Sequence, residues 1–248
     1  MRKVKLIYPN LNSKLVGQKL AIRDELQLSH LRVIRATIDN YQYEIGDGKG
    51  RIAEGELLKL TKKGALFLVK SIESRSSSNN YNINLILPLV RQARLEEAIL
   101  GVVQLDLFQS ITLYFSDYTR YTDKILSDNK LARFNKIITA GYSQSGSIIK
   151  PLLLKSDSLA EAIADKDLLV VPSTKASYFS LKDLTSILEK DDIKNISLVI
   201  GPEGGFSPQE EKIISKFNYS YSFKYRDSIL TTETAAISFS AILTLALG

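Results

Sequence analysis

One short segment, residues 197–211, constrains the fold of this chain more than any other part of the sequence. It reads S-L-V-I-G-P-E-G-G-F-S-P-Q-E-E, an apolar run followed by a glycine-rich turn. Residues 198–200 are typical of a buried strand. Ser207, Pro208 and Glu210 form a capping-box pattern that predicts a helix start. The segment therefore predicts a strand, a tight turn and a helix, an arrangement that brings backbone close to a ligand in α/β proteins.

A glycine pair alone is equally well explained by an ordinary tight connection between a strand and a helix. A second segment favours the ligand site. Residues 228–236 read S-I-L-T-T-E-T-A-A and follow about 25 residues later in the chain. They lead into a long apolar run that predicts the last helix. The two segments together are more specific than either one alone.

Strand and helix patterns alternate through the carboxyl-terminal two thirds of the chain. Alternation of this kind indicates an α/β domain with a parallel sheet. We expect strands at 85–87, 111–115, 168–171, 198–200 and 221–223, a brief extended piece at 152–153, and helices at 95–105, 130–142, 158–164, 181–189, 209–217 and 232–247.

The first 72 residues follow a different pattern, with short strands separated by turn residues. Two glycine-containing turns, 46–50 and 62–64, indicate hairpins. One stretch, 30–35, has a helical pattern. We expect a small β-barrel with one helix, and strands at 4–8, 41–45, 51–59 and 65–72. The polar, serine-rich stretch 72–84 indicates a linker, so we expect domains at 1–74 and 80–248.

Composition excludes several classes of protein. The chain has no cysteine and a single histidine, His30, so disulfides, thiolate chemistry and a zinc site are not expected. The first residues lack the apolar core of a signal peptide. The longest apolar stretch, 235–247, is too short to span a bilayer, which takes about 20 residues. We therefore expect a cytoplasmic protein with neither a membrane nor a metal as partner.

Positive charge is concentrated near the amino terminus. Residues 1–80 contain 15 Lys and Arg against 8 Asp and Glu, whereas residues 81–248 contain 18 against 19. A localised basic surface attracts the phosphate backbone of nucleic acids. The same distribution is also compatible with a solvated surface that binds nothing. Charge alone leaves both interpretations open.

Common nucleotide-binding and hydrolase motifs are missing. The turn at 201–205 lacks the Gly-Lys-Ser/Thr ending of a phosphate-binding loop, and its glycines do not have G-x-G-x-x-G spacing. No G-x-S-x-G nucleophile elbow occurs. Hydrolase and dehydrogenase chemistries therefore have little support.

The two carboxyl-terminal segments resemble those of RsmE-type 16S ribosomal RNA (uridine-N3) methyltransferases, members of the SPOUT superfamily. Three weaker matches occur in the same order along the chain. Residues 30–35 are similar to the family's H-x-x-x-L-R element, residues 46–50 to its D-G-x-G turn, and residues 136–146 to its K-I-x-x-E-A-x-x-Q-S-G-R helix. The resemblance therefore covers nearly the whole chain.

This resemblance implies a fold and a function. It implies a PUA-like β-barrel that binds RNA, followed by an α/β domain with a trefoil knot that binds S-adenosyl-L-methionine. It further implies methylation of a uridine N3 in 16S ribosomal RNA, with ribosomal RNA or the small ribosomal subunit as partner. A homodimer whose site draws on both subunits is also implied.

The resemblance also indicates site residues. Backbone groups in glycine loops can hold an adenosyl group that carries no phosphates. We expect the cofactor to contact three loops and the start of the last helix, at Val171, Pro172, Gly201, Pro202, Glu203, Gly204, Gly205, Ile229, Leu230, Thr232, Thr234 and Ala235. The catalytic group is open, with Glu233 and Thr231 as candidates. RNA contacts are expected at His30, Arg32 and Arg35.

Several of these residues have a second interpretation. Glu203 can brace its loop instead of touching the ligand. Glu233 can simply favour its helix N-terminus. His30 is equally compatible with a partly buried structural histidine. Arg32 and Arg35 are three residues apart, which predicts one helical face.

The chain departs from the family pattern where arginines are expected. Ser228 and Thr231 flank the I-L pair, Ser147 ends the Q-S-G element, and Thr139 or its neighbour Ala140 replaces an acidic residue. Losing a hydrogen bond to a charged group costs about 1.5–3 kcal/mol. An alternative function is therefore a catalytically weak or inactive RNA- or ribosome-binding protein. Nearby cations that could substitute are Arg226, Lys224 and Arg120.

Overall fold

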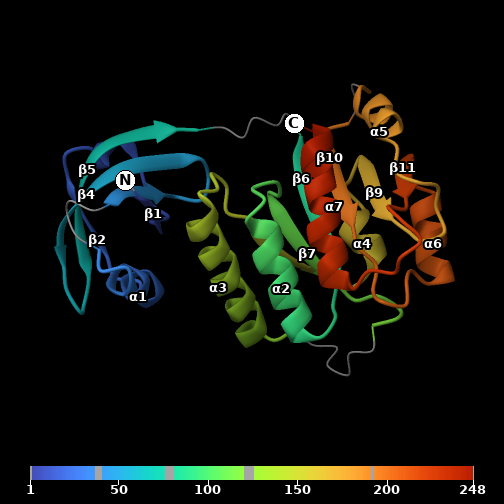
Figure 1. Ribbon diagram of the computed structural model, residues 1–248, viewed down its shortest axis with the longest axis horizontal. Coiled ribbons are helices and arrows are strands. Elements are labelled where there is room, and N and C mark those ends of the chain that lie inside the picture. Colours follow the sequence, from blue (N-terminus) through green and yellow to red (C-terminus); the bar gives the residue numbers. More distant parts are fainter. Residues whose placement is uncertain (1, 37–40, 76–80, 120–125, 191–192, 248) are drawn as a thin grey trace. The chain divides into compact units, whose positions relative to one another are not determined.

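The computed structural model describes residues 2–36, 41–75, 81–119, 126–190 and 193–247. The chain forms two compact units (Figure 1). The first contains Met1–Ser78 together with Tyr142–Lys150, and the second contains Asn79–Gly141 with Pro151–Gly248. In the described part of the chain, no helix is long and apolar enough to cross a membrane.

A five-stranded sheet forms the first unit. The strands are β1 (Arg2–Ile7), β2 (Lys19–Ile22), β3 (Tyr41–Gly46), β4 (Arg51–Leu60) and β5 (Ala65–Ser74), in the spatial order β1-β3-β4-β5-β2. The pair β1–β3 is parallel and the other pairs are antiparallel. A short 3-10 helix, η1 (Ser13–Leu15), and one α-helix, α1 (Glu25–Val33), complete the unit.

The predicted strands and both hairpins of this unit are confirmed, but β2 was missed. It has only four residues and pairs with β5. Its Leu20 and Ile22 are buried while the residues between and before them are exposed. The helix was predicted too late in the sequence, because Asp24 caps α1 by accepting a hydrogen bond from Gln27 N at 3.0 Å.

The predicted linker at 72–84 was wrong at both ends. Strand β5 continues to Ser74, and the next strand already begins at Asn82. At the end of β5 the polar residues occupy exposed strand positions, whereas Asn84 of β6 is buried and its Oδ1 accepts a hydrogen bond from Ser110 Oγ. Residues 76–80 lie outside the described part of the chain.

The end of helix α3 (Asp128–Ser145) and the segment after it pack in the first unit. Lys5 is buried, and its Nζ donates to the carbonyl oxygen of Gly146 at 2.9 Å and to that of Ser147. The same ammonium lies 4.6 Å from the ring centroid of Tyr142. A buried charge needs such partners, so Lys5 anchors this carboxyl-terminal segment of the helix.

A six-stranded parallel sheet forms the second unit. Its order is β11-β9-β10-β6-β7-β8, and the register pairs are all parallel. The strands are β6 (Asn82–Pro88), β7 (Ser110–Tyr114), β8 (Leu152–Ser156), β9 (Leu168–Pro172), β10 (Asn195–Val199) and β11 (Tyr219–Phe223). The predicted parallel α/β sheet is confirmed.

Helices cover both faces of this sheet. They are α2 (Gln92–Val103), most of α3, α4 (Leu159–Ile163), α5 (Leu181–Leu188), α6 (Pro208–Ser215) and α7 (Thr232–Leu247). In Figure 1, α2 and α7 lie side by side on one face. Ile86 packs with residues of α4 and α6, and its neighbours Leu85 and Leu87 are equally buried. Burial on both faces explains why these strands read as continuous apolar runs.

The connections place three loops together at the carboxyl ends of neighbouring strands. The chain runs outward through β6, β7 and β8, and then returns to the other side for β9, β10 and β11. The last three strands are neighbours and parallel, so their carboxyl ends lie together. Ligands of open α/β sheets bind at such a reversal of strand order, beyond the carboxyl ends of the strands.

Candidate active site

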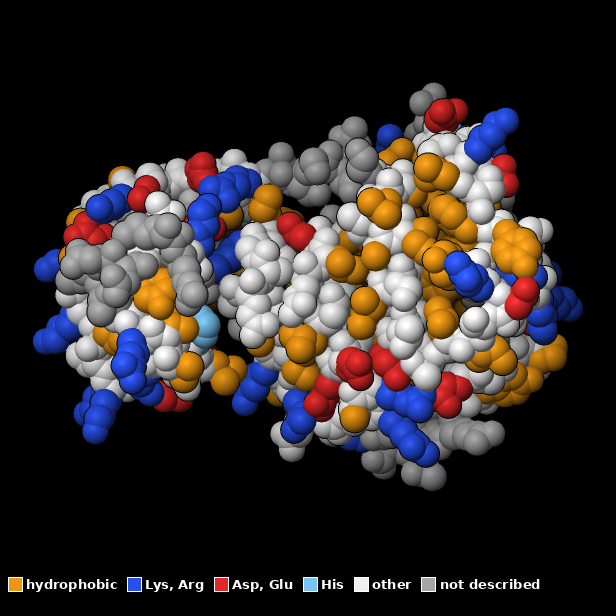
Figure 2. All heavy atoms as spheres, viewed as in Figure 1, with side chains coloured by type: hydrophobic (Ala, Val, Ile, Leu, Met, Phe, Trp, Pro, Cys, Tyr) orange, Lys and Arg blue, Asp and Glu red, His pale blue; other side chains and the backbone are white. Residues whose placement is uncertain are grey.

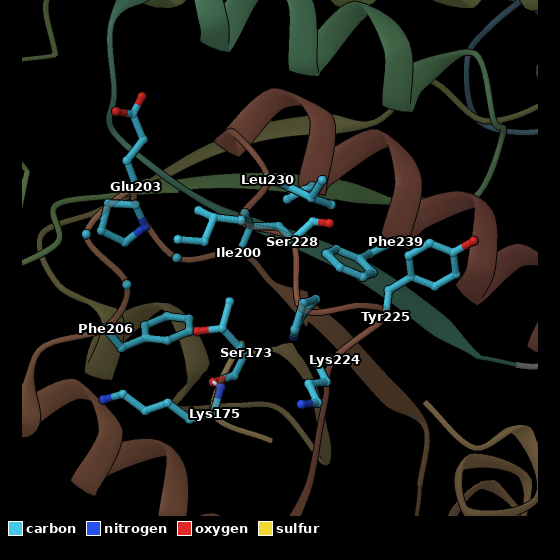
Figure 3. Close-up of a pocket in the computed structure, with 18 of the residues that line it drawn as sticks. Ser173, Lys175, Ile200, Glu203, Phe206, Lys224, Tyr225, Ser228, Leu230 and Phe239 are labelled. Carbon is cyan, nitrogen blue, oxygen red and sulfur yellow. Dashed lines mark hydrogen bonds between the residues drawn. The ribbon is translucent and has the colours of Figure 1, made fainter. Parts of the chain in front are cut away.

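Three loops at the carboxyl ends of β9, β10 and β11 surround a cavity of about 360 Å³, here called the first cavity (Figure 3). Its volume falls within the usual range of small-molecule sites. Residues of α6 and α7 complete the wall. The lining comprises Pro172, Ser173, Thr174, Lys175, Ile200, Gly201, Pro202, Glu203, Gly204, Gly205, Phe206, Glu211, Lys224, Tyr225, Arg226, Ser228, Ile229, Leu230, Ala235 and Phe239.

The loop after β10 is held by its own backbone and by the cap of α6. Gly205 has a φ of 76°, which favours glycine, and its N–H donates to the carbonyl oxygen of Pro202 at 2.8 Å. Ser207 and Glu210 form the predicted capping box, with hydrogen bonds of 3.1 and 2.9 Å. A Cβ on Gly201 would lie 3.2 Å from the ring of Phe206. The ring of Phe206 therefore packs closely against Gly201 at the wall of the first cavity.

The loop after β11 is attached to the loop after β9. The N–H of Ser173 donates to the carbonyl oxygen of Phe223 at 2.8 Å, and the N–H of Lys224 donates to Ser177 at 2.7 Å. The ammonium of Lys224 lies 2.8 Å from Asp227 and 4.4 Å from the ring centroid of Tyr178. These bonds bring two loops that are distant in sequence to one side of the cavity.

Apolar side chains form the flat walls of the first cavity. Ile200 and Phe206 come from the loop after β10, Leu230 precedes α7 and Phe239 lies on α7, and these side chains surround one space in Figure 3. Phe239 is 6% exposed and packs edge-on against Phe223, with ring centroids 5.3 Å apart. Such walls, next to loop backbone, fit an aromatic base attached to a polar sugar.

A second cavity, of about 880 Å³, lies on the other side of the loop after β10. It shares Pro202, Glu203 and Gly204 with the first cavity. The remaining lining comes from the start of α2 and from the turn after β7. It consists of Leu89, Val90, Arg91, Arg94, Asp117, Tyr118 and Thr119.

An ion-pair cluster lies beside the second cavity. Nη1 of Arg94 pairs with Oε1 of Glu203, and its Nε lies 3.9 Å from Oε1 of Glu233. In Figure 3 the carboxylate of Glu203 points away from the other labelled residues of the first cavity. Figure 2 shows acidic and basic side chains gathered at the ends of α2 and α7 where these helices begin. Glu203 therefore braces its loop against α2.

Most of the residues expected to contact the cofactor line the first cavity, at Pro172, Gly201, Pro202, Glu203, Gly204, Gly205, Ile229, Leu230 and Ala235. Val171, Thr232 and Thr234 do not. Val171 is buried in the core with α4 and α6. Thr232 is buried, and its hydroxyl has no hydrogen-bond partner in the described part of the chain. Thr234 is exposed, with its hydroxyl 3.0 Å from that of Thr231.

Gly204 lies next to Tyr118 of the second cavity. A Cβ added there would lie 3.6 Å from Cδ2 of Tyr118, an ordinary contact distance. Gly204 therefore separates the two cavities and tolerates a small side chain. Gly205 is the position where the backbone conformation favours glycine, and a Cβ at Gly201 would press against the ring of Phe206.

The two catalytic candidates lie outside both cavity walls. Glu233 is on the first turn of α7 with its side chain 12% exposed, and its Oε2 has no hydrogen-bond partner among the described residues. Thr231 is exposed and precedes the helix. Within the described residues, Glu233 is linked to the second cavity through its ion pair with Arg94.

The residues expected to bind RNA lie on the first unit, at the end of α1. His30 is exposed, so a partly buried structural histidine is wrong. Arg32 pairs with Glu25 at 3.0 Å and donates to the carbonyl oxygen of Lys62 at 2.6 Å. Arg35 follows the helix end with a φ of 51°. The expected shared helical face of Arg32 and Arg35 is therefore wrong, because α1 ends before Arg35.

The positions where arginines were expected differ in their surroundings. Ser147 is 1% exposed, and its carbonyl oxygen accepts from Lys5, so it does not face a ligand. Ser228 lines the first cavity, as do the proposed substitutes Lys224 and Arg226. Arg120 lies outside the described residues.

Sequence reasoning missed residues in both cavities. Phe239 lies four residues after Ala235 and so on the same face of α7, a spacing that could have revealed it. The second cavity had no comparable signal, since Arg91, Arg94 and Tyr118 belong to no recognisable motif. Among the described residues, no group of three or more His, Cys, Asp or Glu side chains could hold a metal ion.

Comparisons with known proteins agree with this architecture. The model of the RNA methyltransferase domain family matches residues 77–244. The ribosomal RNA small subunit methyltransferase E of Helicobacter pylori strain J99 is 27% identical over 190 residues, which cover 75% of this chain and 77% of that protein. The ribosomal RNA small subunit methyltransferase E 1 of Borreliella burgdorferi is 22% identical over 228 residues, which cover 88% of this chain and 90% of that protein.

Solved structures share the fold across both units. A ribosomal RNA small subunit methyltransferase E from Neisseria gonorrhoeae, bound to S-adenosyl methionine, has a TM-score of 0.82 at 23% identity and covers 98% of each chain. A Legionella pneumophila protein in complex with the same cofactor also has a TM-score of 0.82, at 21% identity, with 99% of this chain and 98% of that chain covered. The family match spans more than half of the sequence, and this chain belongs to the RNA methyltransferase domain family.

Proposed function

We propose that this protein is an S-adenosyl-L-methionine-dependent methyltransferase that modifies N3 of a uridine in 16S ribosomal RNA. The first cavity carries the proposal, because three loops bring glycine backbone and apolar walls around one space. The relatives named as small subunit methyltransferases and the two structures that contain the cofactor support it.

The residues of the first cavity fit this cofactor. Leu230, Ile200 and Phe239 offer apolar surfaces for the adenine, and the backbone of residues 201–205 offers hydrogen-bonding groups. When bound, S-adenosylmethionine supplies an electrophilic methyl group.

The protein's part in the reaction is mainly positioning. Holding two reactants in the correct geometry supplies up to about 7–11 kcal/mol in ideal cases. Removal of the N3 proton leaves negative charge on the uracil, which a nearby cation stabilises. Arg94 fits this role because it lies beside the loop shared by the two cavities. Glu233 then acts as a positioning residue for Arg94.

We assign RNA binding to residues 1–74 and methyl transfer to residues 80–248. Lys and Arg side chains are spread over the visible face of the first unit (Figure 2). His30 and Arg35 are exposed there and are available for contact with RNA. The unit's sheet and helix are compatible with a PUA-like barrel.

We further propose the trefoil knot and the homodimer of the SPOUT superfamily. Helix α7 follows β11 at one edge of the sheet and then packs on α2, which follows β6 in the middle. The chain between β11 and α7 therefore passes back across the loops after β9 and β10. This route is the one that a knotted carboxyl terminus requires.

Methyl transfer to small-subunit RNA tests the proposal. Small ribosomal particles from a strain without the endogenous enzyme are incubated with the protein and the cofactor, and the RNA nucleosides are analysed by mass spectrometry. We expect 3-methyluridine at one site. A methyl group on another base would redirect the assignment, and no transfer at all would contradict it.

The second candidate function is an RNA- or ribosome-binding protein with little or no activity. Ser228 and Thr231 favour it, because neither can stabilise negative charge as an arginine does. This candidate predicts RNA binding without turnover in the same assay. Thr231→Arg should then raise the rate, whereas an already robust rate that this substitution leaves unchanged would speak against it.

A further inference from the structure

The second cavity has the composition of a site for a single nucleotide of RNA. Tyr118, which is exposed, lines this cavity together with Arg91 and Arg94. Single-stranded nucleic acids are held by stacking of bases on aromatic rings and by cations along the backbone. We propose that this cavity binds the target pyrimidine nucleotide, with its base on Tyr118 and its phosphate on Arg91.

The ring of Tyr118 is exposed but its backbone is fixed. Tyr118 is 46% exposed, and its ring lies next to Gly204. Its turn is attached to α6, since Ser116 Oγ and the N–H of Asp117 donate to the carboxylate of the buried Glu210 at 3.2 and 3.3 Å. Ser207 Oγ also donates to Asp117 at 2.5 Å. A ring held in this way can receive a base at little entropic cost.

The two arginines have different tasks. Arg91 is exposed, and its guanidinium has no ion-pair or hydrogen-bond partner in the described part of the chain, so it is available for a phosphate. Arg94 is held by Glu203 and Glu233. A guanidinium has five N–H donors, so Arg94 can still donate to a carbonyl oxygen of the base.

The position of the cavity relates it to methyl transfer. Pro202, Glu203 and Gly204 form one strip of wall for both cavities. A nucleotide in the second cavity therefore lies across a single loop from the first. The inference rests on the proposed function in taking RNA as the ligand, and it adds the side chains that hold the target nucleotide.

Photocrosslinking locates the nucleotide without any substitution. A short RNA oligonucleotide containing one 4-thiouridine is bound to the full chain and irradiated, and the crosslinked peptide is identified by mass spectrometry. We expect the crosslink at Tyr118 or in the segments 89–94 and 202–204. Crosslinks confined to other segments would overturn the proposal.

Variants measure the contributions of the two groups. Tyr118→Ala should weaken binding of the same oligonucleotide about 5- to 150-fold, the loss expected for one stacked base, while Tyr118→Phe should retain wild-type affinity. Arg91→Gln should reduce the log–log salt slope of binding by about 0.7, as for one phosphate contact on a single strand. Arg133→Gln is the matched control, because Arg133 pairs with Glu96 and lines neither cavity.

The outcomes separate this inference from the proposed function. Affinity for S-adenosylhomocysteine, measured by calorimetry, should be unchanged in all four variants, which also shows that they fold. Unchanged RNA binding by both Tyr118→Ala and Arg91→Gln would overturn the nucleotide site even if the wild type methylates RNA. A wild type that transfers no methyl group but crosslinks at Tyr118 would retain the site and reject the function.

Discussion

The two cavities of the second unit are built in different ways. The first consists of loop backbone and apolar walls, arranged where three parallel strands end. The second consists of charged and aromatic side chains that α2 and the turn after β7 bring to the loop after β10. The difference shows how one loop can serve two ligands: its backbone faces one cavity, and Glu203 is turned toward the other.

The largest expected difference is in how substitutions in the two cavity walls change the free energy of unfolding. Phe239 is a wall of the first cavity and also part of the core, so Phe239→Ala should lower the free energy of unfolding by about 3–5 kcal/mol. Tyr118→Ala removes an exposed ring and should change it by less than about 0.5 kcal/mol. Urea unfolding of both variants checks this. Equal losses would contradict the distinction between a wall shared with the core and an exposed wall.

Cofactor affinity sharpens the comparison within one loop. Gly201→Val places a side chain against Phe206, where a Cβ is already only 3.2 Å from the ring. Moving Phe206 to make room for the valine side chain should cost about 1–3 kcal/mol. This cost corresponds to about 5- to 150-fold weaker binding of S-adenosylhomocysteine, which calorimetry measures. Gly204→Ala is the matched control, since its Cβ meets Tyr118 at an ordinary 3.6 Å. Similar affinities in the two variants would argue against a backbone-lined first cavity.

The ion-pair cluster is expected to have a smaller effect. Arg94→Gln leaves the nearly buried carboxylate of Glu233 without its cation and should destabilise the protein by about 1–2 kcal/mol. The combination with Glu203→Gln should be non-additive by about 0.5 kcal/mol or more, because the two side chains are in contact. A double-mutant cycle in urea measures this coupling. Strict additivity would show that the pair does not brace the loop.

The smallest effect concerns a carboxylate that lines neither cavity. Burial raises the pKa of Asp167, but hydrogen bonds from the backbone of Asn195 and Lys194 and from the Asn195 side chain outweigh it, so the pKa is lowered. Because the folded-state pKa is depressed, this stabilisation is present above the unfolded value of about 3.9 and is lost as pH falls through the lower folded-state value.

Asp167→Asn should therefore reduce the loss of stability on acidification by about 0.5–1.5 kcal/mol and leave binding to the first cavity unchanged. Thermal unfolding between pH 2 and pH 6 measures the first effect, and calorimetry with S-adenosylhomocysteine measures the second. If the variant and the wild type lost stability equally between pH 6 and pH 2, Asp167 would not be a source of the pH dependence.

The first cavity could be predicted from the sequence because its signals are local. The glycine turn, the capping box of Ser207 and Glu210, and the apolar run before them lie within fifteen residues. Parallel alternation then places such loops at one edge of the sheet. Val171, Thr232 and Thr234 were exceptions, and at Val171 strand alternation turns the side chain into the core.

The second cavity could not be predicted in this way. Arg94 and Glu203 are far apart in sequence, and only the folded sheet brings α2 next to the loop after β10. In the first unit, β2 was missed because four residues carry too little periodicity. Arg35 was misplaced because its left-handed conformation after α1 has no sequence signal, unlike a glycine at that position.

The most direct test of the account is a crystal structure of the chain with S-adenosylhomocysteine. We predict density for the adenosyl group between residues 172–175, 200–206 and 224–230, with the base against Leu230 and Phe239. Density for the ligand at any other place would contradict the claim that these three loops form the cofactor site. The same holds if Phe206 fills the space between the loops and no ligand lies there.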